Sequence, residues 1–175
     1  SITNEGTIKV ASGIVVSDIG SAVEDITNSG TISMFGSNPT PSGSSSFGIS
    51  IDKMAQVGSI TNTGTISCVT SNECVNRNSI EVRNGAIVNS ITNEGELDFA
   101  KIEVSDVGTT VEDIKNTGTI NMGSSFTGLA GINIEDGAQV GTITNTGFIE
   151  AGNRFAILID DTASVTQINN AGTIN

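Results

Sequence analysis

Short alternating runs of aliphatic and polar residues follow one another along the whole chain of 175 residues. The commonest run has the frame Ile-x-Asn-x-Gly, and its seven copies begin at Ile2, Ile26, Ile60, Ile91, Ile114, Ile143 and Ile168. Successive copies are 23 to 34 residues apart. A period in this range is typical of solenoids, in which each repeat is one structural unit stacked on its neighbours.

A second phrase lies between successive copies, and its Ile-x-[Val/Ile] pattern is the period-2 alternation of a short strand. Its six copies cover 13–18, 48–52, 79–84, 101–106, 131–136 and 156–161. A third phrase with the same alternation, such as Ala55-Gln56-Val57, follows four of them. The 3.6-residue period of an amphipathic helix is not found, so the pattern predicts strands.

The spacing of these phrases predicts the architecture. The first Ile of the second phrase always lies 11 or 12 residues before the next Ile-x-Asn-x-Gly, whereas the other half of each repeat varies from 11 to 23 residues. All insertions therefore fall at one corner, and the long ones cover 34–47, 69–79 and 121–129. This pattern indicates an all-β fold, a single-stranded parallel β-helix (β-solenoid) of about seven rungs with three short strands per rung.

The rod should be on the order of 30 Å long, because its rungs would lie about 4.8 Å apart. Four to six buried aliphatic side chains per rung roughly match the ordering entropy of the rung, so stability must come from stacking. Residues 1–175 are therefore expected to form one domain. The chain starts and stops inside a motif, which leads us to expect a fragment of a longer array.

The Ile-x-Asn-x-Gly frame predicts a corner built from amides and glycines. The asparagines are expected to stack, each side-chain amide donating to the carbonyl of the next, because an amide carries donor and acceptor together. This ladder comprises Asn4, Asn28, Asn62, Asn93, Asn116, Asn145 and Asn170. The glycines are expected to turn the chain in a left-handed conformation, which costs glycine no Cβ clash. These turn glycines are Gly6, Gly30, Gly64, Gly95, Gly118, Gly147 and Gly172.

Composition narrows the classes of function. The chain has no Trp, Tyr or His, and 19 acidic residues against seven basic ones give a formal charge of −12. Phosphate backbones and anionic lipid heads repel such a surface, so we expect neither nucleic-acid nor membrane-surface binding. A run of about 18 apolar residues is absent, so we expect no direct membrane insertion of this segment.

The phrase Ile-x-Asn-x-Gly-Thr-Ile, with Gly-Ile-x-[Val/Ile] behind it, resembles the repeat region of bacterial autotransporter passenger domains, the exported part of type V secretion proteins. The resemblance covers the chain from Ile2 to Asn175. It implies a right-handed coil at a Gram-negative cell surface, anchored to the outer membrane in the full-length protein. It also implies a stalk or adhesin whose partner is a receptor or glycan on a host or neighbouring cell, or a second copy.

Two cysteines, Cys68 and Cys74, lie in the insertion of the third repeat. Five intervening residues can close a small loop, so we predict a disulfide that fixes this loop in an oxidising compartment. A metal site needs more ligands than two cysteines, and a redox motif usually has two intervening residues. We therefore expect neither a metal nor a cofactor, and the pair favours an extracellular location.

Neighbouring carboxylates are the candidate chemistry for a carbohydrate-processing enzyme or a Ca²⁺ site. The pairs are Glu24-Asp25, Glu112-Asp113, Glu135-Asp136 and Asp160-Asp161. Sites that cleave sugars usually add stacking aromatic and basic residues, which are scarce here. Adjacent residues on a strand should also face opposite sides. We interpret the pairs as solvated surface charge, with weak Ca²⁺ binding as the alternative.

The long insertions are candidate partner-binding loops, because a rigid scaffold would hold them along one edge. Tolerated decoration is the alternative interpretation. The candidate contact residues are Asn38, Ser44, Asn72, Glu73, Asn76, Arg77 and Phe126. The sequence thus predicts a non-enzymatic surface stalk or adhesin. A carbohydrate-binding or carbohydrate-processing β-helix is the alternative, and an ice-binding solenoid is a minor one, because charged and bulky residues interrupt the threonine rows.

Overall fold

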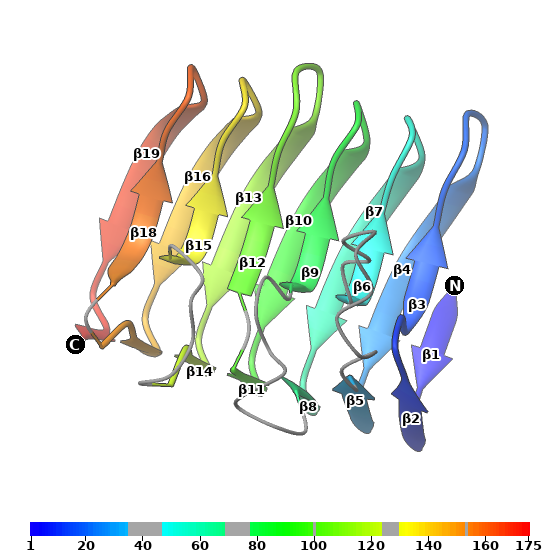
Figure 1. The fold of residues 1–175 in the computed structure, drawn as a ribbon, viewed down its shortest axis with the longest axis horizontal. Coiled ribbons are helices and arrows are strands. Elements are labelled where there is room, and N and C mark those ends of the chain that lie inside the picture. Colours follow the sequence, from blue (N-terminus) through cyan, green and yellow to red (C-terminus); the bar gives the residue numbers. More distant parts are fainter. Residues whose placement is uncertain (35–46, 69–77, 100, 124–129, 153) are drawn as a thin grey trace, which may run out of the picture.

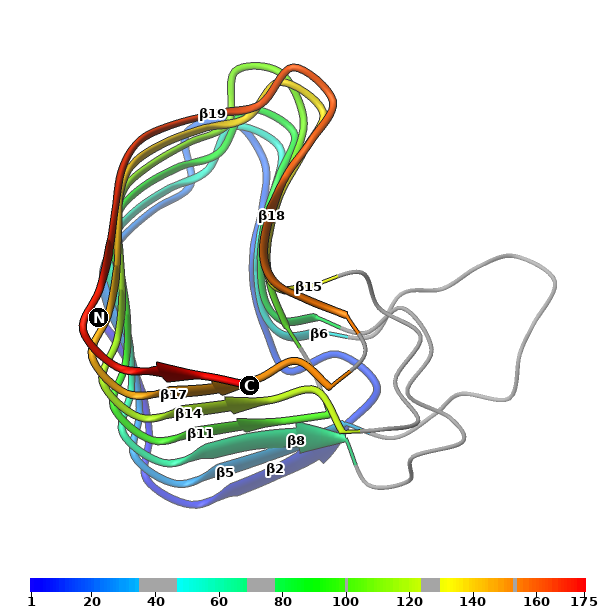
Figure 2. The same ribbon diagram turned by 90° about the vertical axis from the view of Figure 1, so that its left-hand side faces the viewer.

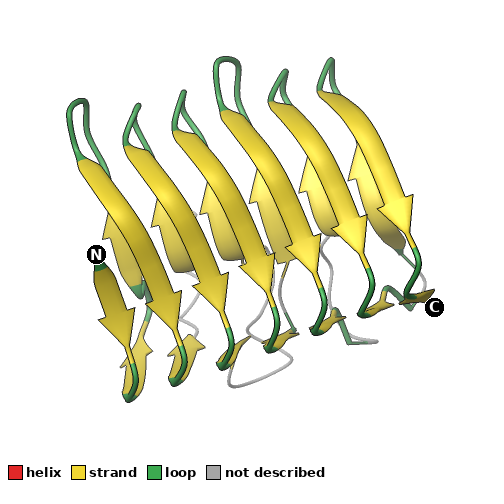
Figure 3. Ribbon diagram, turned by 180° about the vertical axis from the view of Figure 1, so that it is seen from behind, coloured by secondary structure: helices red, strands yellow, loops and turns green. Residues whose placement is uncertain are grey.

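The protein is a stack of parallel strands, shown by a computed structural model that describes residues 1–34, 47–68, 78–99, 101–123, 130–152 and 154–175. Twenty strands form three parallel sheets, and the described residues contain no helix (Figures 1 and 3). The predicted all-β parallel β-helix is therefore confirmed. The right-handed coil stays a prediction.

Each sheet takes one strand from every rung. Sheet A comprises, in spatial order, β1 (Ile2–Asn4), β4 (Ala22–Asn28), β7 (Gln56–Asn62), β10 (Ile87–Asn93), β13 (Thr110–Asn116), β16 (Gln139–Asn145) and β19 (Ser164–Asn170). Sheet B comprises β2 (Thr7–Val10), β5 (Thr31–Met34), β8 (Thr65–Cys68), β11 (Glu96–Asp98), β14 (Thr119–Asn121), β17 (Phe148–Glu150) and β20 (Thr173–Ile174). Sheet C comprises β18 (Phe155–Ile159), β15 (Ala130–Ile134), β12 (Lys101–Val104), β9 (Asn78–Val82), β6 (Phe47–Ile51) and β3 (Ile14–Val16).

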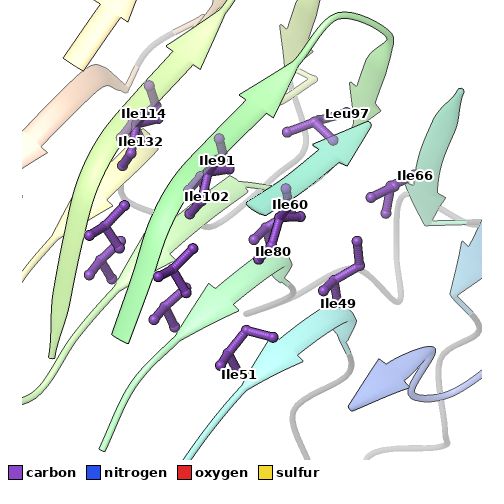
Figure 4. Packing of buried hydrophobic residues seen from close by; sticks show 14 of the residues in the cluster. Ile49, Ile51, Ile60, Ile66, Ile80, Ile91, Leu97, Ile102, Ile114 and Ile132 are labelled. Atoms are coloured by element: carbon purple, nitrogen blue, oxygen red, sulfur yellow. The ribbon is translucent and has the colours of Figure 1, made fainter. Parts of the chain in front are cut away.

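Equivalent residues of successive repeats are paired directly. Ile60 of β7 lies between Ile26 of β4 and Ile91 of β10, and the asparagine two positions later keeps the same register. The core between the sheets is aliphatic, and the inward-facing isoleucines of the inner strands of all three sheets are fully buried (Figure 4). Figure 2 looks along the stack and shows the three sheets around this core. Each rung buries its apolar face against its neighbours.

The third phrase is not a separate strand. Gln56 and Val57 form the first part of β7, and Ile60 to Asn62 form the last part. The register with the neighbouring strand omits Gly58, so the strand bends at this position. The second half of each Ile-x-Asn-x-Gly-Thr-Ile phrase instead forms the strand of sheet B. The rung therefore has three strands as predicted, with sheet A formed by two phrases.

Candidate functional site

The structure brings the seven asparagines together at the corner between sheets A and B. Six hydrogen bonds of 2.7 to 2.8 Å run from each Asn Nδ2 to the Oδ1 of the next. The five asparagines from Asn28 to Asn145 are fully buried. The ladder thus has the geometry of a continuous amide row along the rod.

The same side chains satisfy the backbone of the corner. Nδ2 of Asn93 also donates to the carbonyl of Gly95 in its own rung, at 3.3 Å, and to that of Thr119 in the next, at 3.1 Å. Backbone N–H groups of the turn reach back as well, and Gly95 N donates to the Asn62 carbonyl at 3.0 Å. A buried carbonyl or N–H without a partner costs free energy, so this network stabilises a corner that the sheets leave unpaired.

The turn glycines lie at this corner, but the expected left-handed conformation is wrong. A positive φ is found at none of Gly6, Gly30, Gly64, Gly95, Gly118, Gly147 and Gly172. A Cβ on Gly95 would lie 2.0 Å from the Gly64 carbonyl oxygen, and the corresponding distances at the other five stacked glycines are 2.0 to 2.2 Å. Glycine is required because the backbones of successive corners touch. Of these seven glycines, only Gly6, in the first rung, has open space around the position of a Cβ.

Left-handed residues instead form the corner between sheets C and A. They are Asp18, Gly20, Lys53, Met54, Asn84, Gly85, Asp106, Gly108, Asp136, Gly137, Asp161 and Thr162. Asp and Asn tolerate this conformation better than most other residues, because their side chains can hydrogen-bond locally. The short polar sequence after each second phrase therefore carries the turn signal.

The long insertions all leave the rod at the third corner, between sheets B and C. β5 ends at Met34 before β6 begins at Phe47, and β8 ends at Cys68 before β9 begins at Asn78. The third insertion joins β14 to β15. The candidate contact residues Asn38, Ser44, Asn72, Glu73, Asn76, Arg77 and Phe126 lie outside the described residues. The strand ends place the insertions on one edge.

Cys68 ends β8, where it is buried and in register with Met34. Cys74 lies outside the described residues, so the disulfide between them stays a prediction. Cys68 is the last residue of β8 before the second insertion, and its side chain belongs to the core. The predicted disulfide would therefore tie that loop directly to the core.

Buried charge on the outer face of sheet C was missed by the sequence reasoning. Glu81 of β9 is 2% exposed and is in register with Glu103 of β12, whose side chain is 14% exposed. Nδ2 of Asn78 donates to both, at 2.8 Å to Glu81 Oε1 and 3.3 Å to Glu103 Oε1. Lys101, also buried, forms an ion pair with Glu103. Two carboxylates therefore share one amide across adjacent strands.

Glu81 has two further partners. Ser50 Oγ donates to its Oε2 at 3.1 Å, and Arg83 Nε lies 3.4 Å from the same oxygen. Arg83 also contacts Asp52, with 3.4 Å between Nη2 and Oδ2. Burial raises the pKa of Glu81 above its ordinary value, and the nearby Arg83 opposes this rise only in part. The ionised form of Glu81 is therefore disfavoured in the fold.

Sheet C and the residue after β9 also hold buried polar atoms without hydrogen-bond partners. Four such buried atoms are found among the described residues: Asn78 Oδ1, Ser79 Oγ, Arg83 Nε and Asn133 Oδ1. Glu81, Glu103 and Asn133 all occupy the middle position of the Ile-x-[Val/Ile] phrase, and the alternation puts that position outside the core. Their types were visible in the sequence, but their burial was not.

The four carboxylate pairs lie at two places, the bend of sheet A and the corner between sheets C and A. Glu112 and Asp113 are both exposed, so the expectation that neighbours face opposite sides is wrong here. The reason is the bend in β13, where Glu112 is omitted from the register with both neighbouring strands. Glu24-Asp25 occupies the same bend of β4, whereas Glu135-Asp136 and Asp160-Asp161 lie at the corner between sheets C and A. The described residues hold no cluster of three or more His, Cys, Asp or Glu arranged for a metal ion.

A shallow groove of about 380 Å³ follows the bend across β10, β13, β16 and β19 on the outer face of sheet A. Its lining mixes amides and hydroxyls with apolar side chains, of which Ile87 is exposed, and Glu112 supplies the carboxylate. The polar residues that line it are Asn89, Thr110, Gln139, Ser164 and Thr166. Such a lining can donate and accept hydrogen bonds along the rod axis.

The fold and the asparagine corner define the class of this protein as a parallel β-solenoid. Comparisons with protein-family models, with curated proteins and with solved structures found no match. Within the described part of the chain there is no helix of the length and apolar character needed to cross a membrane.

Proposed function

We propose that the chain is a non-enzymatic stalk or adhesin segment of an autotransporter-like protein at a bacterial cell surface. One observation carries the proposal: in a regular stack of rungs, all three long insertions fall between a strand of sheet B and the next strand of sheet C. Loops held by a rigid scaffold commonly carry recognition, since the scaffold limits the entropy lost on binding. The partner would be a receptor or glycan on another cell, or a second copy of the rod.

Deletion of residues 36–46 tests the proposal. Cells displaying the shortened chain are expected to lose most of their adhesion or autoaggregation, while the rod keeps its thermal stability. Val107→Ser is the matched control, because Val107 is 82% exposed at the opposite corner and its change should leave adhesion intact. If deletions of all three insertions left adhesion unchanged, the chain would be a stalk only.

Carbohydrate binding is a second candidate, favoured by the groove on sheet A, whose lining combines amides and hydroxyls with apolar side chains. Gln139 lies in the groove, whereas Gln56 occupies the same row of sheet A outside it. Gln139→Ala is expected to weaken the binding of a neutral oligosaccharide, measured by calorimetry, and Gln56→Ala is expected to leave it unchanged. An equal effect of both changes would remove this candidate. Detectable depolymerisation of a polysaccharide by the chain would instead remove the non-enzymatic proposal.

A further inference from the structure

We propose that Glu81 and Glu103 form a proton-binding pair that makes the outer face of sheet C more stable in mildly acidic solution than at neutral pH. The inference is independent of the proposed function. The two residues are cross-strand neighbours in register on β9 and β12, and like charges in that position repel. One Asn78 amide donates to both carboxylates, so the same donor serves two acceptors.

The charges around Glu81 come from four rungs. They are Asp52 after β6, Arg83 after β9, Lys101 and Glu103 on β12, and Glu135 after β15. Two cations thus face four carboxylates including Glu81. Lys101 pairs with Glu103, and Arg83 divides its contacts between Glu81 and Asp52. The cluster keeps an excess of negative charge when every carboxyl is ionised.

A proton on Glu81 would supply a donor where acceptors are in excess. The buried Asn78 Oδ1 has no partner, although the Nδ2 of the same amide contacts Glu81. A protonated Glu81 could donate either to the Glu103 carboxylate or to the Asn78 carbonyl after a turn of the amide. Protonation would therefore remove one like-charge contact in either case, and in the second case it would also satisfy the buried Asn78 acceptor.

The sign of the pH effect follows from the pKa of Glu81. Because burial raises this pKa above 4.5, the folded state binds the proton more tightly than the unfolded chain does. The stabilising contribution is fully present below pH 4.5. It is lost as the pH rises from there through the raised pKa of the folded state. Acidification would tighten β9, which follows the second insertion, and the neighbouring strand β12.

The direct test is a carboxyl NMR titration of the wild-type protein. The Glu81 side-chain carboxyl is expected to titrate with a pKa above 4.5. On acidification from neutral pH, the protection factors of amides in β9 and β12, corrected for the intrinsic pH dependence of exchange, are expected to rise about tenfold for each unit by which the pKa is raised. The test requires no variant, so it remains valid if a substitution prevents folding. Titration of Glu81 at or below its ordinary pKa would overturn the proposal.

Variants separate this pair from the general repulsion of an acidic rod. Glu81→Gln stays neutral, so at pH 7 its melting temperature should rise by roughly 3 °C and its dependence on pH should weaken. Glu94→Gln is the matched control, because it removes the same charge from an exposed turn residue. An equal change in melting temperature for the two variants would show that only net charge matters and would contradict the proposal.

Discussion

Gly95→Ala is expected to destabilise the rod by about 3 kcal/mol or more, among the largest effects of any single methyl group in this chain. The added Cβ would lie 2.0 Å from the Gly64 carbonyl oxygen and 2.7 Å from the carbonyl carbon of Thr63. Both obstacles are backbone atoms of a hydrogen-bonded corner, so the stack must shift to relieve the clash. Thermal unfolding followed by circular dichroism should show a fall of roughly 6 to 12 °C in melting temperature.

Gly6→Ala is the matched control. Gly6 occupies the same place in the repeat and likewise lacks a positive φ, yet a Cβ there would meet nothing within 4 Å. Its change should therefore alter the melting temperature by no more than about 2 °C, or raise it slightly by restricting the unfolded chain. Similar losses at Gly6 and Gly95 would contradict the packing explanation. They would indicate instead that the backbone conformation of the turn itself requires glycine.

The sequence alone predicted the architecture because a solenoid repeats one local pattern. The Ile-x-Asn-x-Gly and Ile-x-[Val/Ile] phrases each mark one part of the rung, and their spacing marks the corner that accepts insertions. Ile60 pairs with Ile26 and Ile91 for the same reason that the three sequences align. Local pattern and long-range contact carry the same information in such folds.

The reason for the glycines could not be derived in this way. A glycine before a strand equally suits a left-handed turn and a close backbone approach, and only the stacked coordinates distinguish them. The bend at Glu112 has no alternation signal, since Glu112 and the next residue, Asp113, are both polar. The burial of Glu81 was also hidden, because an outward position in a strand is normally solvated. Each miss concerns contacts between rungs or over a sheet face, which the repeat pattern does not specify.

Asn93→Asp is expected to cost about 3 to 5 kcal/mol at neutral pH, because it places an uncompensated charge in a fully buried row. The new carboxylate could still accept from Asn62 Nδ2. It would, however, face the Asn116 Oδ1 and the carbonyls of Gly95 and Thr119, to which the native amide donates. These acceptors would lose the donor that Asn93 supplies and would repel the charge.

Acid should restore part of the stability of Asn93→Asp. A buried carboxyl without donors has a raised pKa in the folded state, so its penalty disappears as the pH falls through that pKa. A protonated Asp can also donate to one of the abandoned oxygens. Melting curves at pH 7 and pH 4, each compared with wild type at the same pH, would measure this recovery.

Asn170→Asp provides the control for the ladder. Asn170 is exposed and ends the row, where its Nδ2 reaches only the Gly172 carbonyl at 3.5 Å. Its carboxylate can remain hydrated while still accepting from Asn145, so the expected loss is under about 1 kcal/mol and nearly independent of pH. Equal losses at positions 93 and 170 would mean that the amide row adds little beyond the sheets. A large loss at position 93 alone would show that the corner is stabilised by the continuity of its donors, rung after rung.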